Sequence, residues 1–237
     1  MTAPAFRPRR VGILGGMGPA AAIDLQAKVL AATPAASDPE HLPIVVWNVP
    51  QVPDRVAAIL GGGPSPAAAM MEGARALEAA GCEAFAMACN TAHHWAGEIT
   101  ASVRIPLIHI ADAAIDELAS RAVPSMSVGI LATRGTLAAA FYGQRLARRG
   151  FRWLAPTQEE QARWVDVAIA RVKAGDIAGA RPCFEEAARA LAGRGADVIL
   201  LACTELPLAA EGAGCPVPLL DASRALARAI VDFSLRR

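Results

Sequence analysis

The chain has 237 residues, of which 54% are hydrophobic and 19% charged, and its formal net charge is +1. This length allows one large domain or two of about 100 residues each. The near-neutral charge excludes a basic surface for nucleic acid, and no apolar stretch reaches the roughly 18 to 20 residues that a membrane span requires, so the expected partner is a small molecule. The basic N-terminal segment is not followed by an Ala-x-Ala cleavage pattern, which favours the cytoplasm.

Short apolar runs rich in Val and Ile alternate with Ala-rich segments along the chain. The Ala-rich segments, such as 66–80 and 178–191, carry apolar residues every three to four positions and predict helices. Apolar runs between such helices indicate parallel strands covered on both faces, so the expected fold class is doubly wound α/β. The predicted strands are 11–14, 44–49, 84–88, 106–110, 127–131, 152–154, 197–202 and 217–220.

The sequence repeats itself at an offset near 114 positions. Features of 74–89 recur in 188–203 at an offset of 114, 11–14 recurs as 128–131 at 117, and 105–107 recurs as 217–219 at 112. We interpret this as an internal duplication that gives two pseudosymmetric lobes, although coincidence in an Ala-rich chain is the alternative. The expected first lobe comprises 1–103 plus 214–237, because the last helix returns to it. The expected second lobe is 104–213.

The repeat relates two of the five cysteines, Cys89 and Cys203. An odd number of scattered cysteines without a C-x-x-C pair argues against a disulfide framework and a structural zinc site. Ligands of parallel sheets bind beyond the carboxyl ends of the strands, so both thiols are expected to face one crevice. The remaining cysteines, Cys82, Cys183 and Cys215, are expected to be small buried apolar residues.

Two thiols that face each other favour inversion of a stereocentre. Inversion without a cofactor requires a base that removes a proton from one face of a carbon and an acid that returns a proton to the other face. A thiolate and a thiol suit these roles, and an exchange of roles allows both directions.

Small polar residues follow each cysteine, in the order Asn90-Thr91 and Thr204-Glu205. Backbone N–H groups at such helix starts can hold a carboxylate and stabilise a carbanionic transition state. The alternative is that these side chains only cap helices. Glu205 either orients Cys203 or favours the first helical turn through the helix dipole, and the sequence leaves that choice open.

Three motifs, 12–19 (GILGGMGP), 89–93 (CNTAH) and 203–206 (CTEL), closely resemble the aspartate/glutamate racemase family, on its aspartate racemase branch. The resemblance covers nearly the whole chain. Glutamate racemases differ, because they usually begin with Asp-Ser-Gly and carry His where this chain has Glu205. The resemblance implies a PLP-independent amino-acid racemase without cofactor or metal, usually a homodimer, with Cys89 and Cys203 as the catalytic pair and aspartate, then glutamate, as substrate.

The resemblance also assigns residues around the substrate. Arg55, in the loop 51–55, and Lys173 resemble the residues that grip a side-chain carboxylate, a task that suits the guanidinium fork and the ammonium charge. Without the resemblance, both would be interpreted as surface charges. His93 and Glu205 are expected beside the cysteines without contacting the substrate. The expected substrate-binding residues are Met17, Gln51, Arg55, Asn90, Thr91, Thr133, Lys173 and Thr204.

Four other interpretations deserve comparison. Segment 16–21 fits G-x-G-x-x-A, but 48–50 (NVP) lacks the acidic residue that a dinucleotide site needs, so the glycines indicate a close-approach loop at the pocket. A second interpretation is a Cys-His hydrolase or transferase, which the position of His93 and His94 near Cys89 suggests. Related two-cysteine scaffolds also isomerise maleate, racemise hydantoins or decarboxylate arylmalonates. A non-catalytic binder of acidic metabolites is the remaining alternative, against which the presence of both cysteines counts.

Overall fold

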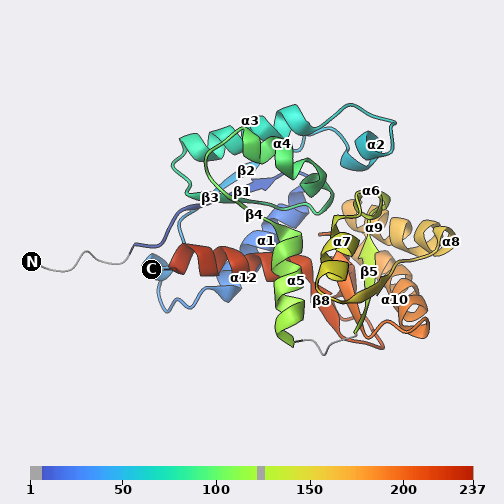
Figure 1. Ribbon diagram of the computed structural model, residues 1–237. Helices are drawn as coiled ribbons and strands as arrows, with labels where there is room; N and C mark the ends of the chain where they lie inside the picture. Colours follow the sequence, from blue (N-terminus) through green and yellow to red (C-terminus); the bar gives the residue numbers. More distant parts are fainter. Residues whose placement is uncertain (1–6, 122–125, 237) are drawn as a thin grey trace, which may run out of the picture.

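The computed structural model describes residues 7–121 and 126–236 and contains two four-stranded parallel sheets (Figure 1). The first sheet has the order β2-β1-β3-β4 and the second has the order β6-β5-β7-β8. All eight predicted strands are present. Their bounds are β1 Val11–Gly15, β2 Ile44–Asn48, β3 Ala84–Met87, β4 Leu107–Ile108, β5 Ser127–Ala132, β6 Arg152–Leu154, β7 Val198–Ala202 and β8 Leu219–Asp221.

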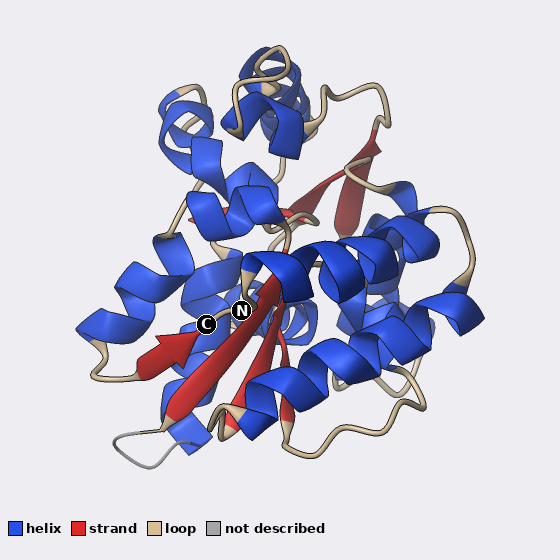
Figure 2. Cartoon of the chain, turned by 90° about the vertical axis from the view of Figure 1, so that its right-hand side faces the viewer, coloured by secondary structure: helices blue, strands red, loops and turns tan. Residues whose placement is uncertain are grey.

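Helices cover both faces of each sheet, as Figure 2 shows for the second one. Within the described residues, no helix is long and apolar enough to cross a membrane. The α-helices are α1 Pro19–Ala32, α2 Arg55–Ile59, α3 Ala67–Ala79, α4 Ala96–Ala101, α5 Ile110–Arg121, α6 Arg134–Ala138, α7 Phe141–Arg148, α8 Gln158–Glu160, α9 Asp166–Lys173, α10 Ile177–Gly193, α11 Leu206–Ala210 and α12 Ala222–Leu235. Two 3₁₀ turns, Asp38–Glu40 and Thr91–Trp95, and one π-helical turn, Gln161–Val165, complete the list.

The central strands explain why the apolar runs are continuous rather than alternating. Every residue of β1, β3, β5 and β7 is buried, because helices lie on both sides of these strands. The edge strand β2 is only partly buried. The doubly wound α/β class predicted from the sequence is therefore confirmed.

The two sheets share one topology and one register. Strand β1 pairs with β3 so that Val11 lies opposite Ala84, and β5 pairs with β7 so that Val128 lies opposite Val198. These partners are related by the offsets of 117 and 114 that the sequence repeat shows. The equivalent edge strands, β4 and β8, pair in corresponding registers as well. The internal repeat is thus visible in the hydrogen-bonding pattern of the backbone.

The edge strands divide the chain differently from the expected lobe boundaries. Strand β4 was expected in the second lobe, yet it pairs with β3 in the first sheet. Strand β8 was expected in the first lobe, yet it pairs with β7 in the second sheet. In each half the chain returns after the cysteine-bearing strand and adds one more parallel strand to the same sheet. Only the helices that follow, α5 and α12, leave their sheet, and they pack against each other, with α12 also lying on α1.

Three hydrophobic clusters form the core. One lies between the first sheet and α3, and includes Leu14, Met70 and Phe85. A second lies between the second sheet and the pair α9 and α10, around Phe184. The third and largest joins residues of both sheets with α1, α5 and α12. Because both sheets contribute to this third cluster, the two lobes share one interior.

Gly16 fixes the loop that follows β1. Its φ angle is +87°, and a Cβ atom at this position would lie 2.1 Å from the carbonyl oxygen of Val49. Only glycine allows so close an approach to the end of β2. This approach places Met17 beside the segment that carries Arg55.

Candidate active site

Cys89 and Cys203 line the same cavity. Cys89 follows β3 and Cys203 follows β7, which are equivalent strands of the two sheets. The two residues are 6% and 3% exposed. The carboxyl ends of two parallel sheets therefore meet at this point, as the repeat predicted, and each supplies one thiol.

The cavity is small, with about 20 Å³ open to the centre of a water molecule, which is room for about one water. It contains ten of the residues that the sequence singled out and two that it did not, Asp54 and Val56. The ten are Met17, Arg55, Cys89, Asn90, Thr91, Thr133, Lys173, Cys203, Thr204 and Glu205.

Gln51 does not line this cavity, and its side chain is exposed. Arg55, four positions later, begins α2. The Asp54 carboxylate accepts a hydrogen bond from the backbone N–H of Ala57 at 2.7 Å and so caps the helix. Gln51 lies earlier, in the turn that follows β2, and so stays outside the cavity that Arg55 lines. An aspartate between a proline and a short apolar segment was the available signal for the cap.

Arg55 is a buried guanidinium held by carbonyl groups. Its Nη1 donates to the carbonyl oxygens of Val52 and Pro53 at 3.2 and 3.0 Å, and its Nη2 donates to that of Met17 at 2.9 Å. No carboxylate of the described residues pairs with it, and its Nε has no hydrogen-bond partner there. A buried cation with a free N–H group beside a cavity is suited to bind an anion.

The positive charges of Arg55 and Lys173 influence the pKa of Cys89. Burial raises the pKa of the Cys89 thiol, and the positive charge of Arg55 opposes that rise. The negative charge of Glu205 raises this pKa further, whereas the backbone N–H of Ala92 and, more weakly, the Lys173 ammonium lower it. Lys173 ends α9 in the second lobe, so both lobes contribute a cation.

Cys203 is in direct contact with the acidic side chain of Glu205. Its thiol donates a hydrogen bond to the Glu205 carboxylate at 3.1 Å, and the Thr204 hydroxyl donates to the same oxygen at 3.2 Å. Burial raises the pKa of Cys203 well above its ordinary value, and the negative charge of Glu205 raises it further. The choice that the sequence left open is thereby decided, because Glu205 contacts the Cys203 thiol.

The polar residues around the cysteines are not all helix caps. Asn90 precedes a 3₁₀ turn, but its side chain makes no cap hydrogen bond. Thr133 does cap α6, by accepting from the N–H of Thr136 at 3.1 Å, and it also lines the cavity. The hydroxyls of Thr91, Thr133 and Thr136 lie 2.9 to 3.0 Å from one another. This buried triangle ties the Cys89 loop to the second lobe.

His93 lies behind Cys89 and does not contact its thiol. Its Nε2 accepts a hydrogen bond from the N–H of Ile110 at 3.2 Å, so its Nδ1 carries the proton and donates to the Cys89 carbonyl oxygen at 2.8 Å. Burial lowers the pKa of His93 well below its ordinary value, with a smaller contribution from His109. Both ring nitrogens are therefore engaged with the backbone, which argues against a Cys-His hydrolase.

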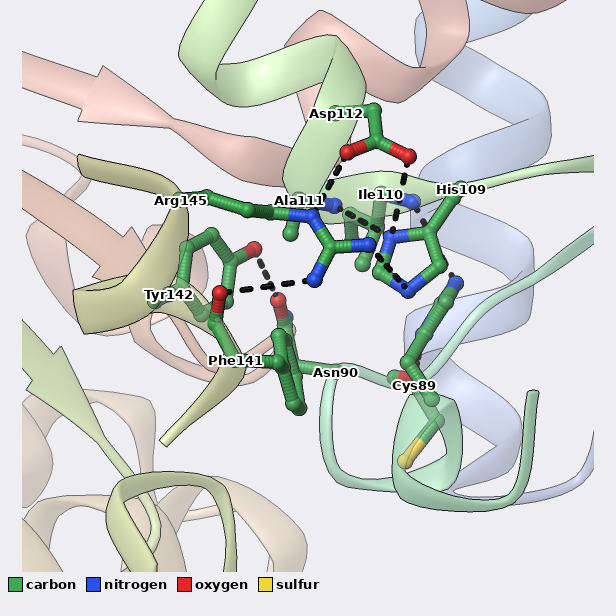
Figure 3. A network of polar contacts seen from close by, with 10 residues as sticks. Cys89, Asn90, His109, Ile110, Ala111, Asp112, Phe141, Tyr142 and Arg145 are labelled. Carbon is green, nitrogen blue, oxygen red and sulfur yellow. Dashed lines mark hydrogen bonds and ion pairs between the residues drawn. The ribbon is translucent and has the colours of Figure 1, made fainter. Parts of the chain in front are cut away.

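A polar network that the sequence did not reveal extends from this loop (Figure 3). His109 precedes α5, packs edge-on against His93 with ring centroids 4.4 Å apart, and lies near Arg145 of α7. Arg145 in turn donates to the carboxylate of Asp112 at 2.6 Å. Tyr142, also of α7, donates to Asn90. No motif marks these residues in the sequence, because their proximity depends on how the lobes pack.

We expect the two buried histidines to make folding sensitive to acid. Burial and the Arg145 charge lower the pKa of His109 from 6.5 to about 3, whereas the unfolded chain binds a proton near the ordinary value. The contribution of each such histidine to the free energy of unfolding is therefore fully present above pH 6.5. It is lost as the pH falls below this value, by about 1.4 kcal/mol per pH unit for each histidine. Urea unfolding between pH 7.5 and 5.5 measures this slope.

His109→Asn is the matched variant, because asparagine retains an acceptor for the N–H of Ala111 that His109 Nδ1 now receives at 3.1 Å. The variant should lose part of the pH dependence. An equal slope in the two proteins would show that His109 does not carry the effect.

The other cysteines lie outside the cavity. All five cysteines are free thiols. Cys82 is buried, as expected, whereas Cys183 and Cys215 are only half-buried at the edge of the second-lobe core.

Comparisons with known proteins show which proteins the chain is similar to. Residues 14–230 match the model of a family described as Asp/Glu/hydantoin racemase. An aspartate racemase from Picrophilus torridus has a similar structure, with a TM-score of 0.85, 30% identity and coverage of 97% of this chain and 95% of that one. The broad specificity amino-acid racemase RacX of Bacillus subtilis is 28% identical over 95% of this chain and 98% of its own length. A glutamate racemase from Francisella tularensis in complex with D-glutamate, at 16% identity, shares the fold with a TM-score of 0.67 and coverage of 93% of this chain and 79% of that one.

Proposed function

The chain belongs to the Asp/Glu/hydantoin racemase family, and from this premise we propose that it interconverts the L and D forms of an acidic amino acid, aspartate first and glutamate second, without a cofactor. It is an isomerase of the racemase type. The observation that carries the proposal is the pair of buried thiols, Cys89 and Cys203, that two equivalent strands bring to one cavity.

The proposed reaction moves two protons. The thiolate of one cysteine takes the α-proton, and the electron pair of the broken C–H bond stays on the substrate as a carbanion delocalised into the α-carboxylate. The thiol of the other cysteine then gives its proton to the opposite face of the same carbon and becomes a thiolate. The enzyme is left with the two thiol states exchanged, which is the form that runs the reverse reaction.

The charges around the thiols support different resting states. Burial raises the pKa of both thiols, and the charge of Glu205 raises both further. Arg55 and Lys173 oppose this rise at Cys89, whereas at Cys203 Glu205 also accepts the S–H hydrogen bond. We therefore propose that Cys89 is the thiol that loses its proton more readily and that Cys203 is the thiol that retains it.

The preference for an acidic substrate rests on unused donors. Arg55 Nε and Asn90 Nδ2 are buried polar atoms without partners in the described chain, and Lys173 adds a charge at the same cavity. Two carboxylates of an acidic amino acid would satisfy these donors. The shorter side chain of aspartate suits so small a cavity better than that of glutamate. Because aspartate is far larger than one water, the walls must move apart to admit it.

Exchange of the α-proton in D2O tests the proposal directly. Purified protein without added PLP or metal is incubated with L- or D-aspartate, and loss of the α-proton signal is followed by NMR, with chiral chromatography to detect inversion. We expect exchange and inversion from both enantiomers, followed by slower reaction of glutamate. Absence of exchange with every amino acid would contradict the substrate proposal and direct the assay to maleate, hydantoins and arylmalonates. The homodimer and the cytoplasmic location stay predictions from the sequence.

A further inference from the structure

Tyr142 is the only tyrosine of the chain, and it is 2% exposed on α7 of the second lobe. Its hydroxyl donates a hydrogen bond of 2.6 Å to Oδ1 of Asn90, which follows Cys89 in the first lobe (Figure 3). The contact therefore joins an element outside the cavity to a residue that lines it.

The geometry indicates which end of the Asn90 amide receives this bond. A separation of 2.6 Å is usual for O–H···O and short for N–H···O. Burial raises the pKa of Tyr142 well above its ordinary value, so the phenol keeps its proton and remains able to donate. The amide oxygen thus faces Tyr142, and the amide nitrogen faces the other way.

That nitrogen is the unused donor. Asn90 is 2% exposed, and its Nδ2 has no partner among the described residues. We propose that Tyr142 is a positioning residue, which holds the Asn90 amide so that Nδ2 can donate to the α-carboxylate of the substrate. This inference rests on the proposed racemase function.

The hydrogen bond from Asn90 would gain strength during the reaction. Removal of the α-proton places additional negative charge on the carboxylate oxygens, so a fixed donor stabilises the transition state more than the bound substrate. Without the phenol, the amide is no longer held in one orientation, and Nδ2 is less often aligned with the carboxylate when the additional charge develops. The loss should therefore appear in kcat rather than in KM.

A double-mutant cycle tests the coupling. We expect Tyr142→Phe to lower kcat for aspartate about tenfold with little change in KM, and Asn90→Ala to lower it about 10²-fold. In the Asn90→Ala background, Tyr142→Phe should change kcat less than about twofold, because the residue it positions is absent. An equal loss in both backgrounds would mean that Tyr142 only packs the lobes together, and would overturn the proposal.

Ser234→Ala is the matched control. Ser234 lies near the end of α12, and its hydroxyl is also buried. It also donates a hydrogen bond of 2.6 Å, in this case to the carbonyl oxygen of Arg9. Both variants remove one buried hydroxyl and are expected to lower stability similarly, as urea unfolding would show. Only Tyr142→Phe should lower kcat, and an equal effect of the two variants on kcat would contradict the specific role.

The single tyrosine also permits a readout that does not need turnover. Protein labelled with ¹³C at the tyrosine Cζ gives one resonance, which should move in the Asn90→Ala variant and stay in place in Ser234→Ala. A resonance unchanged by Asn90→Ala would overturn the proposal. Wild-type protein that exchanges no amino acid would instead overturn the racemase function, so the two failures are distinct.

Discussion

Replacement of either Cys89 or Cys203 by alanine is expected to lower the rate of inversion about 10³-fold, in both directions. Inversion needs a base on one face of the α-carbon and an acid on the other, and each lobe supplies one thiol to the shared cavity. Polarimetry with L- and D-aspartate measures the loss. Cys215→Ala is the control, because Cys215 is a half-buried free thiol outside the cavity, and this variant should retain wild-type activity.

The single variants should differ from each other in a second assay. With Cys203 removed, Cys89 can still take and return a proton on its own face, so one enantiomer should exchange its α-proton with D2O without inversion. With Cys89 removed, the other enantiomer should be the one that exchanges. Exchange of the same enantiomer by both variants would contradict the placement of the thiols on opposite faces.

Arg55→Lys is expected to lower kcat/KM for aspartate about 10²-fold while leaving stability high enough to measure. The guanidinium bonds three carbonyl oxygens and still has Nε free, whereas a lysine ammonium cannot reach all of these groups. The residual rate for asparagine should change little, because its side chain carries no charge for Arg55 to bind. Steady-state kinetics on the two substrates gives the ratio.

Arg134→Lys provides the matched conservative change. Arg134 begins α6 and pairs with Asp166 at 2.5 Å on the surface, with its side chain 44% exposed. This variant should behave as the wild type. If Arg55→Lys weakens aspartate and asparagine equally, Arg55 supports the loop rather than selecting the substrate.

The sequence was most informative where one physical cause determined the pattern. Burial on both faces made the strands continuous apolar runs, and the repeat placed Cys89 and Cys203 at equivalent strand ends. The offsets between repeated segments even match the register of the strand pairs. These features are local, or follow from comparing the chain with itself.

The sequence was less informative where a single turn or a contact between separate segments decides the outcome. Strand β4 has only two residues, and its membership of the first sheet is set by pairing with β3 rather than by its own composition. Gln51 lies in the turn after β2 and outside the cavity, and its role at the substrate stays a prediction. Tyr142 meets Asn90 across 52 positions, and no spacing rule connects them.

Thermodynamics limits how far the unequal surroundings of the two thiols can make the two directions of the reaction differ. The L and D forms of an amino acid have the same free energy in water, so at equilibrium the two free forms are present at equal concentrations. The ratio kcat/KM must then be identical for the two directions, whatever Arg55 does to Cys89 or Glu205 to Cys203. The difference between the two thiols can change kcat and KM for one direction only by the same factor. A cavity with one acidic and one basic side can therefore have a lower KM for one mirror image, but it must then convert that form with a correspondingly lower kcat.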